Sequence, residues 1–120
     1  MKALAALAST SFLALAAGTF SSSAIALDVE AAKALAEQNN CMQCHGLRKD
    51  KDGPSFLSTA DKYRGKANAV DEVVKHLTSG KKIKLADGTQ ENHKVAKTIP
   101  PNDGAQLKNL AQYILSTQAK

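Results

Sequence analysis

The chain has 120 residues, which is enough for one domain, and a formal net charge of +5. This positive charge is modest, and the sequence contains no long basic block and no nucleic-acid recognition motif. We therefore expect no nucleic-acid partner. The two cysteines, without a second cysteine pair, do not supply the ligands of a zinc site.

Residues 1–26 have the pattern of a cleaved secretory signal peptide. Lys2 supplies the positive charge, residues 3–17 form a short apolar run, and residues 24–26 match an A-x-A cleavage site. An uncleaved membrane anchor is the alternative, but polar residues interrupt the run, and about 20 apolar residues are needed to cross a bilayer. We therefore expect export to the periplasm, a single domain over residues 27–120, and no membrane span in the mature chain.

A predicted helix begins after an N-cap at Asp28 and leads into the most informative motif of the chain. Residues 41–45 read Cys-Met-Gln-Cys-His, the attachment signature of a c-type haem. Cys41 and Cys44 can form thioethers with the two vinyl groups of one haem, and His45 can then bind the iron as proximal ligand. The motif predicts one covalently bound haem c.

The same two cysteines allow other interpretations. In an exported protein they could form a disulfide, and in a thioredoxin-like fold they could form a dithiol redox pair. The thioredoxin-like fold needs a βαβ pattern, which the sequence lacks. Haem attachment is favoured because the motif coincides with an export signal and a helical context. A small mature domain with few aromatic residues also suits packing around a large apolar cofactor.

Between the haem motif and Gly80 the sequence predicts a loop and two helices. Residues 46–58 are rich in charge and are expected to form a loop. Ser58 and Asp61 have the spacing of a capping box, which predicts a short helix through Tyr63. A stripe of apolar residues at helical spacing then predicts a longer helix that ends at Gly80.

The C-terminal part of the chain predicts a long loop followed by a helix. Residues 81–102 are expected to be irregular, because two adjacent prolines exclude a helix there. Asp87-Gly88 signals a tight turn that could close a small hairpin, but we favour a plain loop. Asp103 is the expected N-cap of the final helix, whose apolar residues again lie on one stripe.

With the haem motif, Gly53-Pro54, the Pro-Pro-Asn segment at residues 100–102 and an apolar C-terminal helix, the chain resembles the small class I bacterial c-type cytochromes. The resemblance covers nearly all of residues 27–120. It implies an all-α cytochrome c fold, with about four short helices wrapped around one covalently attached haem and the terminal helices crossing. It also implies that the backbone at Pro54 accepts the imidazole N–H of His45, which fixes the ring and raises its basicity.

The chain departs from this family at the sixth iron position. The family usually places a methionine where this chain has Ile99; Met1 would leave with the signal peptide, and Met42 lies inside the attachment motif. His93, in the loop from which the family presents its distal ligand, is therefore the predicted distal ligand. The resemblance places His76 near a haem propionate. The alternatives are ligation by His76, by a lysine or asparagine near His93, or an open position.

These features predict a periplasmic electron carrier with His/His ligation and a lowered reduction potential, because methionine raises the potential of haem. No clear acid–base pair predicts an enzyme, although the chain could serve as the haem subunit of a larger oxidoreductase. The alternative is a sensor or ligand-binding protein whose distal position takes NO or CO. The expected partners are redox proteins, with acidic surfaces if Lys81, Lys82 and Lys84 form a docking patch rather than a solvated face.

Overall fold

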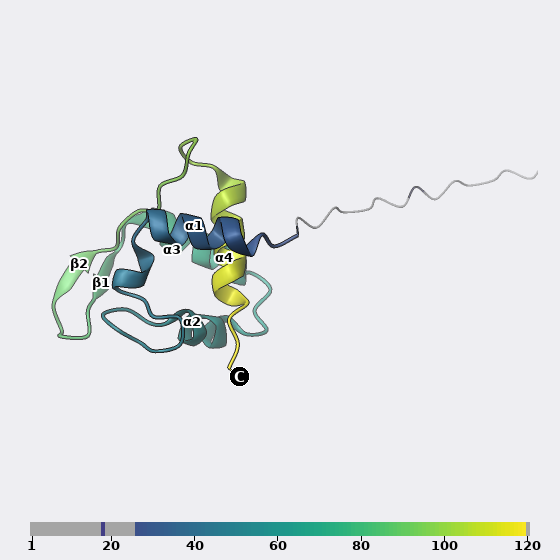
Figure 1. Cartoon of the computed structure of the whole chain (residues 1–120). Helices are drawn as coiled ribbons and strands as arrows, with labels where there is room; N and C mark the ends of the chain where they lie inside the picture. The colour runs from purple at the N-terminus through teal and green to yellow at the C-terminus, as the bar shows by residue number, and fades with distance from the viewer. Residues whose placement is uncertain (1–17, 19–25, 120) are drawn as a thin grey trace, which may run out of the picture.

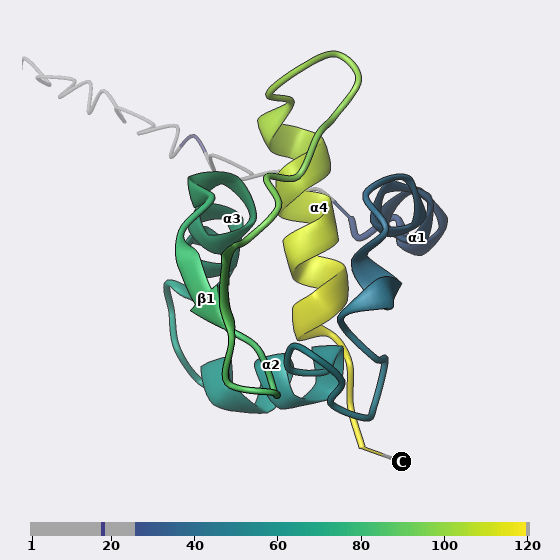
Figure 2. The ribbon, with the colours of Figure 1, turned by 90° about the vertical axis from the view of Figure 1, so that its left-hand side faces the viewer.

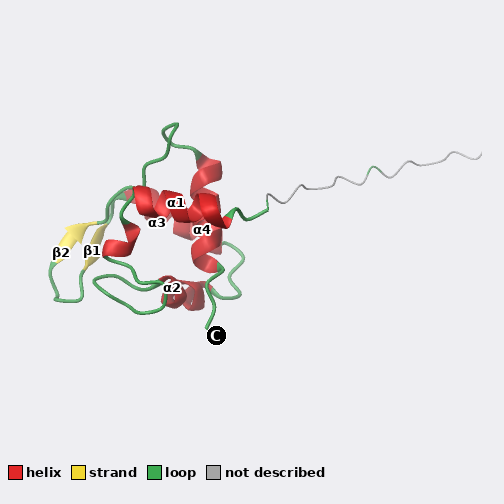
Figure 3. Ribbon diagram, in the orientation of Figure 1, coloured by secondary structure: helices red, strands yellow, loops and turns green. Residues whose placement is uncertain are grey.

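The computed structural model describes residue 18 and residues 26–119, so the predicted signal peptide lies almost wholly outside the described residues. The described chain is mainly helical, with one small sheet (Figure 3). None of its helices is long and apolar enough to cross a membrane. In chain order the elements are α1 (Val29–Gln38), the 3-10 helix η1 (Cys41–Gln43), α2 (Phe56–Tyr63), α3 (Ala69–Ser79), β1 (Lys82–Lys84), β2 (Gln90–Asn92) and α4 (Gly104–Leu115). Figure 1 labels all of them except η1.

Helix α1 crosses α4, as expected, and Figure 2 shows α1 end-on beside α4. Ala32 of α1 and Ala111 of α4 are fully buried, and their small side chains let the two backbones approach closely. Asp28 caps α1 by accepting the N–H of Ala31 at 3.0 Å. The Asn109 side chain of α4 makes two hydrogen bonds to the backbone of Asp28. It accepts the Asp28 N–H at 2.9 Å and donates to the Asp28 carbonyl at 2.8 Å.

Helix α4 is the centre of the core, because α1, α2 and α3 all pack against it. Leu110, near the middle of α4, is fully buried. Burial of such aliphatic side chains supplies most of the free energy that holds these helices together. The core cluster takes one to three residues from each helix: Leu35, Ala36, Phe56, Val73, Leu77, Leu110, Ala111 and Ile114.

Helix α2 begins earlier than predicted. Its first residue is Phe56, and its N-cap is Ser55, whose hydroxyl accepts the N–H of Ser58 at 3.0 Å. The capping box at Ser58 and Asp61 was therefore the wrong start signal. Ser58 lies inside the helix, where its hydroxyl donates to the Asp50 carboxylate at 2.7 Å. Both serines suit an N-cap, and only the path of the preceding loop decides between them.

Residues 81–102 contain a hairpin, so the favoured plain loop was wrong and the hairpin interpretation is correct. Strands β1 and β2 pair antiparallel, with Ile83 opposite Glu91. At the turn, Gly88 adopts φ 88°, and the Asp87 carboxylate accepts the N–H of Thr89 at 2.9 Å. Five of the six strand residues are exposed, so the short strands carry no alternating apolar pattern that would have predicted them.

The ends of α3 and α4 follow the sequence signals. Gly80 ends α3 in the left-handed conformation, with φ 58°, which glycine adopts at little cost. Asp103 caps α4 by accepting the N–H groups of Ala105 and Gln106 at 2.9 and 3.1 Å. The predicted all-α fold is thus confirmed, with the hairpin as an addition.

Candidate haem site

One cavity of about 400 Å³ lies between η1, α2, α3, the hairpin and the loop that follows β2. All the residues that the sequence singled out for haem attachment, iron ligation or haem contact lie in its wall. They come from η1 and the residues directly after it, from the loop before α2, from α3 and from the loop that follows β2. These residues are Cys41, Cys44, His45, Pro54, His76 and His93.

The two cysteines are positioned by a tight turn that follows α1. Asn40 adopts a left-handed conformation, with φ 54°, and turns the chain from α1 into η1. The N–H of His45 donates to the Cys41 carbonyl at 3.0 Å, which places both cysteines and His45 on one compact turn. Both thiols are free and partly buried, and burial raises the pKa of Cys41.

The His45 ring is held by one strong contact. Its Nδ1 lies 2.6 Å from the carbonyl oxygen of Pro54, which can only accept a hydrogen bond. Nδ1 therefore carries a proton, and Nε2 is the ring nitrogen that can offer a lone pair to a metal ion. The geometry is the one that the family resemblance implied for Pro54.

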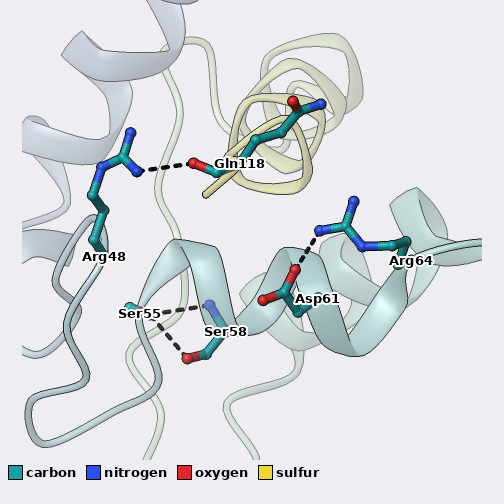
Figure 4. A network of polar contacts seen from close by, with 6 residues as sticks. All are labelled: Arg48, Ser55, Ser58, Asp61, Arg64 and Gln118. Atoms are coloured by element: carbon teal, nitrogen blue, oxygen red, sulfur yellow. Dashed lines mark hydrogen bonds and ion pairs between the residues drawn. The ribbon is translucent and has the colours of Figure 1, made fainter. Parts of the chain in front are cut away.

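The loop that presents Pro54 is fixed by Asp50. Its carboxylate accepts the N–H of Ser55 and the hydroxyl of Ser58, both at 2.7 Å, and the Ser55 N–H is the main reason why the pKa of Asp50 is lowered. Figure 4 shows the Ser55–Ser58 contact at the start of α2. In the same view, Arg48 donates to the Gln118 carbonyl and ties this loop to the C-terminal segment.

Gly53 lies directly against the His45 ring. A Cβ atom added to Gly53 would lie 2.8 Å from Cε1 and 3.1 Å from Nδ1 of that ring. The Gly53 N–H also donates to the Cys44 carbonyl at 2.8 Å, so its backbone has little room to withdraw. The absence of a side chain at Gly53 is therefore a condition for the observed position of His45. Sequence reasoning noted Gly53 only as a family mark and missed this contact.

His93 approaches His45 from the loop after β2. Its N–H donates to the Lys81 carbonyl at 2.9 Å, and its ring centroid lies 6.1 Å from that of His45, with the ring planes at 51°. Nδ1 of His93 is buried and has no hydrogen-bond partner. Burial is the largest cause of a lowered pKa at His93, so the imidazole is neutral at physiological pH, the form that binds iron.

His76 lies beside His93 rather than in the core. It is half-buried on α3, and its ring centroid is 4.3 Å from that of His93. Burial first, and then the charge of His93, lower the pKa of His76 to about 4. The structure therefore gathers three imidazole rings in one cavity, and no pattern in the sequence indicates how close they are.

The position where the family usually has methionine is directed away from the cavity. Ile99 is 78% exposed and does not line the cavity. Met42 is also exposed and does not line it. Among the residues that the structure describes, the cavity wall thus contains imidazole nitrogens but no thioether sulfur.

The residues in the wall fit a haem better than a bare metal ion. Over residues 26–119, no group of three or more histidine, cysteine, aspartate or glutamate side chains is arranged to hold a metal ion. Two imidazoles suffice where a porphyrin supplies the other ligands. Rings that bind one metal from two sides have centroids about 6 Å apart, since each bond is about 2 Å and each nitrogen lies about 1 Å from its centroid. The His45–His93 separation of 6.1 Å fits this value.

The comparison with known protein families agrees with this geometry. The family described as cytochrome c matches residues 29–118. The chain belongs to the cytochrome c family. Cytochrome c-552 of Hydrogenobacter thermophilus is 38% identical over 84 residues, which are 68% of this chain and 76% of that protein. As a member of the family, the protein has one covalent haem c as cofactor and functions in electron transfer rather than as an enzyme.

Two solved structures are similar to this chain. The class 1 cytochrome MtoD of Sideroxydans lithotrophicus ES-1 is 48% identical, with a TM-score of 0.72, over 78% of this chain and all of that one (100%). Cytochrome c552 of Nitrosomonas europaea, at 24% identity and a TM-score of 0.56 over 72% of this chain and 99% of that one, shows the fold alone. Class I cytochromes of this kind are typically periplasmic.

Proposed function

We propose that this cytochrome is a periplasmic electron carrier whose haem iron is bound by His45 and His93. Cys41 and Cys44 form the thioethers, and the Pro54 carbonyl orients His45. The observation that carries the proposal is the 6.1 Å separation between the ring centroids of His45 and His93 in one cavity wall. Residues 1–26 are a signal peptide that is removed during export.

The bound haem supplies the electron chemistry, because its iron passes between the ferric and ferrous states. With His45 and His93 as its protein ligands, the iron would have no position open to water or external ligands. The pair of imidazoles favours the ferric state more than a histidine–methionine pair does. The reduction potential is therefore lower than that of methionine-ligated relatives. His76, which lies beside His93 in the cavity wall, would contact a haem propionate.

The optical spectrum of the purified ferric protein tests this ligation. We expect a low-spin spectrum without the near-infrared band that sulfur-to-iron charge transfer produces, and a reduced protein that does not bind CO rapidly. The near-infrared band would contradict the His93 assignment. Rapid CO binding would instead support a ligand-binding or sensor function with an open or displaceable distal position.

The cavity mouth is suited to an acidic redox partner. Lys81 and Lys84 line the cavity, and Lys82 follows the first of them on β1. Such charges steer an oppositely charged partner and are screened as salt is added. Electron transfer to an acidic acceptor protein should slow as ionic strength rises, and Lys84→Gln should slow it more than Lys108→Gln on α4. Stopped-flow rates with an uncharged quinone as acceptor provide the control; rates that do not depend on salt would contradict the docking surface.

A further inference from the structure

We propose that Asn39 is a positioning residue that holds the distal loop, residues 93–103, closed over the haem cavity. The Asn39 side chain makes two hydrogen bonds to the backbone of Lys97 in that loop. Asn39 Oδ1 accepts the Lys97 N–H at 2.7 Å, and Asn39 Nδ2 donates to the Lys97 carbonyl at 3.0 Å. Nδ2 also donates to the Leu35 carbonyl at 2.9 Å, which fixes the amide against the end of α1. The inference rests on the proposed function, in which this loop carries the distal ligand.

Asn39 connects the distal loop to the side of the cavity that carries the haem motif. Asn39 lies two residues before Cys41 and itself lines the cavity. The other backbone anchors at the start of the loop lie on the opposite side: the N–H of Ala96 donates to the Leu77 carbonyl of α3 at 2.8 Å, as His93 does to Lys81. Loss of the Asn39 contacts would therefore leave only a 3.4 Å contact from Gln38 between the loop and α1, while Gln106 of α4 would still donate to the Ile99 carbonyl at 2.8 Å.

This loop places only one small apolar side chain, that of Ala96, against the core cluster. Its two largest aliphatic side chains are solvent-exposed, Val95 by 48% and Ile99 by 78%. Gln38 adds only a longer contact of 3.4 Å to the Lys97 carbonyl. Hydrogen bonds from Asn39 are thus the main restraint between the loop and α1. Segments with few buried apolar contacts open locally at low free-energy cost, so losing these bonds should raise the frequency of opening.

The chain offers a matched control for the loss of such contacts. Asn109 binds Asp28 in the same two-sided way, through the N–H at 2.9 Å and the carbonyl at 2.8 Å. Asn39 and Asn109 are both half-buried. Neither Asn109 nor Asp28 lines the cavity. Asn109→Ala removes an equivalent pair of hydrogen bonds without touching the distal loop.

The test is the rate at which cyanide binds the ferric holoprotein, since cyanide reaches the iron only when the distal loop opens. We expect Asn39→Ala to bind cyanide about tenfold faster than wild type, an effect of the size that two lost hydrogen bonds produce. Asn109→Ala should bind at the wild-type rate, although urea unfolding should show that both variants are less stable. Asn39→Asp keeps the acceptor for the Lys97 N–H but places a carboxylate oxygen opposite the Leu35 and Lys97 carbonyls, so it should also bind cyanide faster than wild type.

Equal rates in Asn39→Ala and Asn109→Ala, including no detectable binding in either, would overturn the inference. If Asn39→Ala yields no folded holoprotein, Asn39→Asp is compared with Asn109→Asp, and the same equality overturns it. Failure of the proposed ligation is distinguishable, because it appears as a His93→Ala variant whose spin state is unchanged. In that case the proposed function fails, whatever the two asparagine variants do.

Discussion

Replacing His93 by alanine is expected to change the ferric iron from low spin to high spin. The distal imidazole would be lost, and the loop contains no second histidine that could take its place as a strong-field ligand. Optical and electron paramagnetic resonance spectra measure the change directly. The reduced variant should also bind CO, which the wild-type protein should exclude.

His76→Ala is the matched control for this substitution. The two histidines lie side by side in the same cavity, with ring centroids 4.3 Å apart, so both variants open similar space. His76→Ala should remain low spin, because the ring that lies 6.1 Å from His45 is that of His93. A low-spin spectrum that persists in His93→Ala, together with a high-spin spectrum in His76→Ala, would assign the distal position to His76 and contradict our proposal.

The parts of the site that depend on a linear pattern could be predicted from the sequence. The spacing of Cys41, Cys44 and His45 specifies one haem on a single turn, and the caps at Asp28 and Asp103 place the two helices that cross behind it. Counting methionines was enough to direct attention to His93. These inferences need only neighbours along the chain, which is why they did not require the fold.

The parts that depend on the path of a loop could not be predicted in this way. Ser55 and Ser58 are equally good caps by type, and the choice between them is made by Asp50, which binds both residues across the proximal loop. The hydrogen bonds between Asn39 and Lys97 join residues that are 58 positions apart, and no local sequence pattern indicates either residue. In the sequence, an asparagine at this place predicts only the end of the helix. Its contact with the distal loop is visible only in three dimensions.

Gly53→Ala is expected to have the second large effect, through the proximal ligand. The added methyl group would lie 2.8 Å from Cε1 of His45, closer than carbon atoms approach without displacement. The ring is held by its 2.6 Å contact with Pro54, so it would have to rotate away from that carbonyl. Overpacking of this kind costs about 1–3 kcal/mol. We expect a less stable holoprotein with a raised reduction potential, since a weaker hydrogen bond makes the imidazole a poorer donor to ferric iron.

Gly104→Ala, at the first residue of α4, is the matched control. It measures the general effect of replacing a glycine by alanine, without a contact between the added methyl group and His45. A Cβ atom at Gly104 would meet no other atom within 4 Å, and neither glycine has the positive φ that disfavours alanine. Gly104→Ala should therefore leave the potential unchanged and the stability equal or slightly higher, because alanine favours a helix. Potentiometric titration and chemical unfolding of both variants decide the matter. If both variants had the same potential and stability, the Gly53 backbone would not be what holds His45 in place, and the proximal side would depend on Pro54 alone.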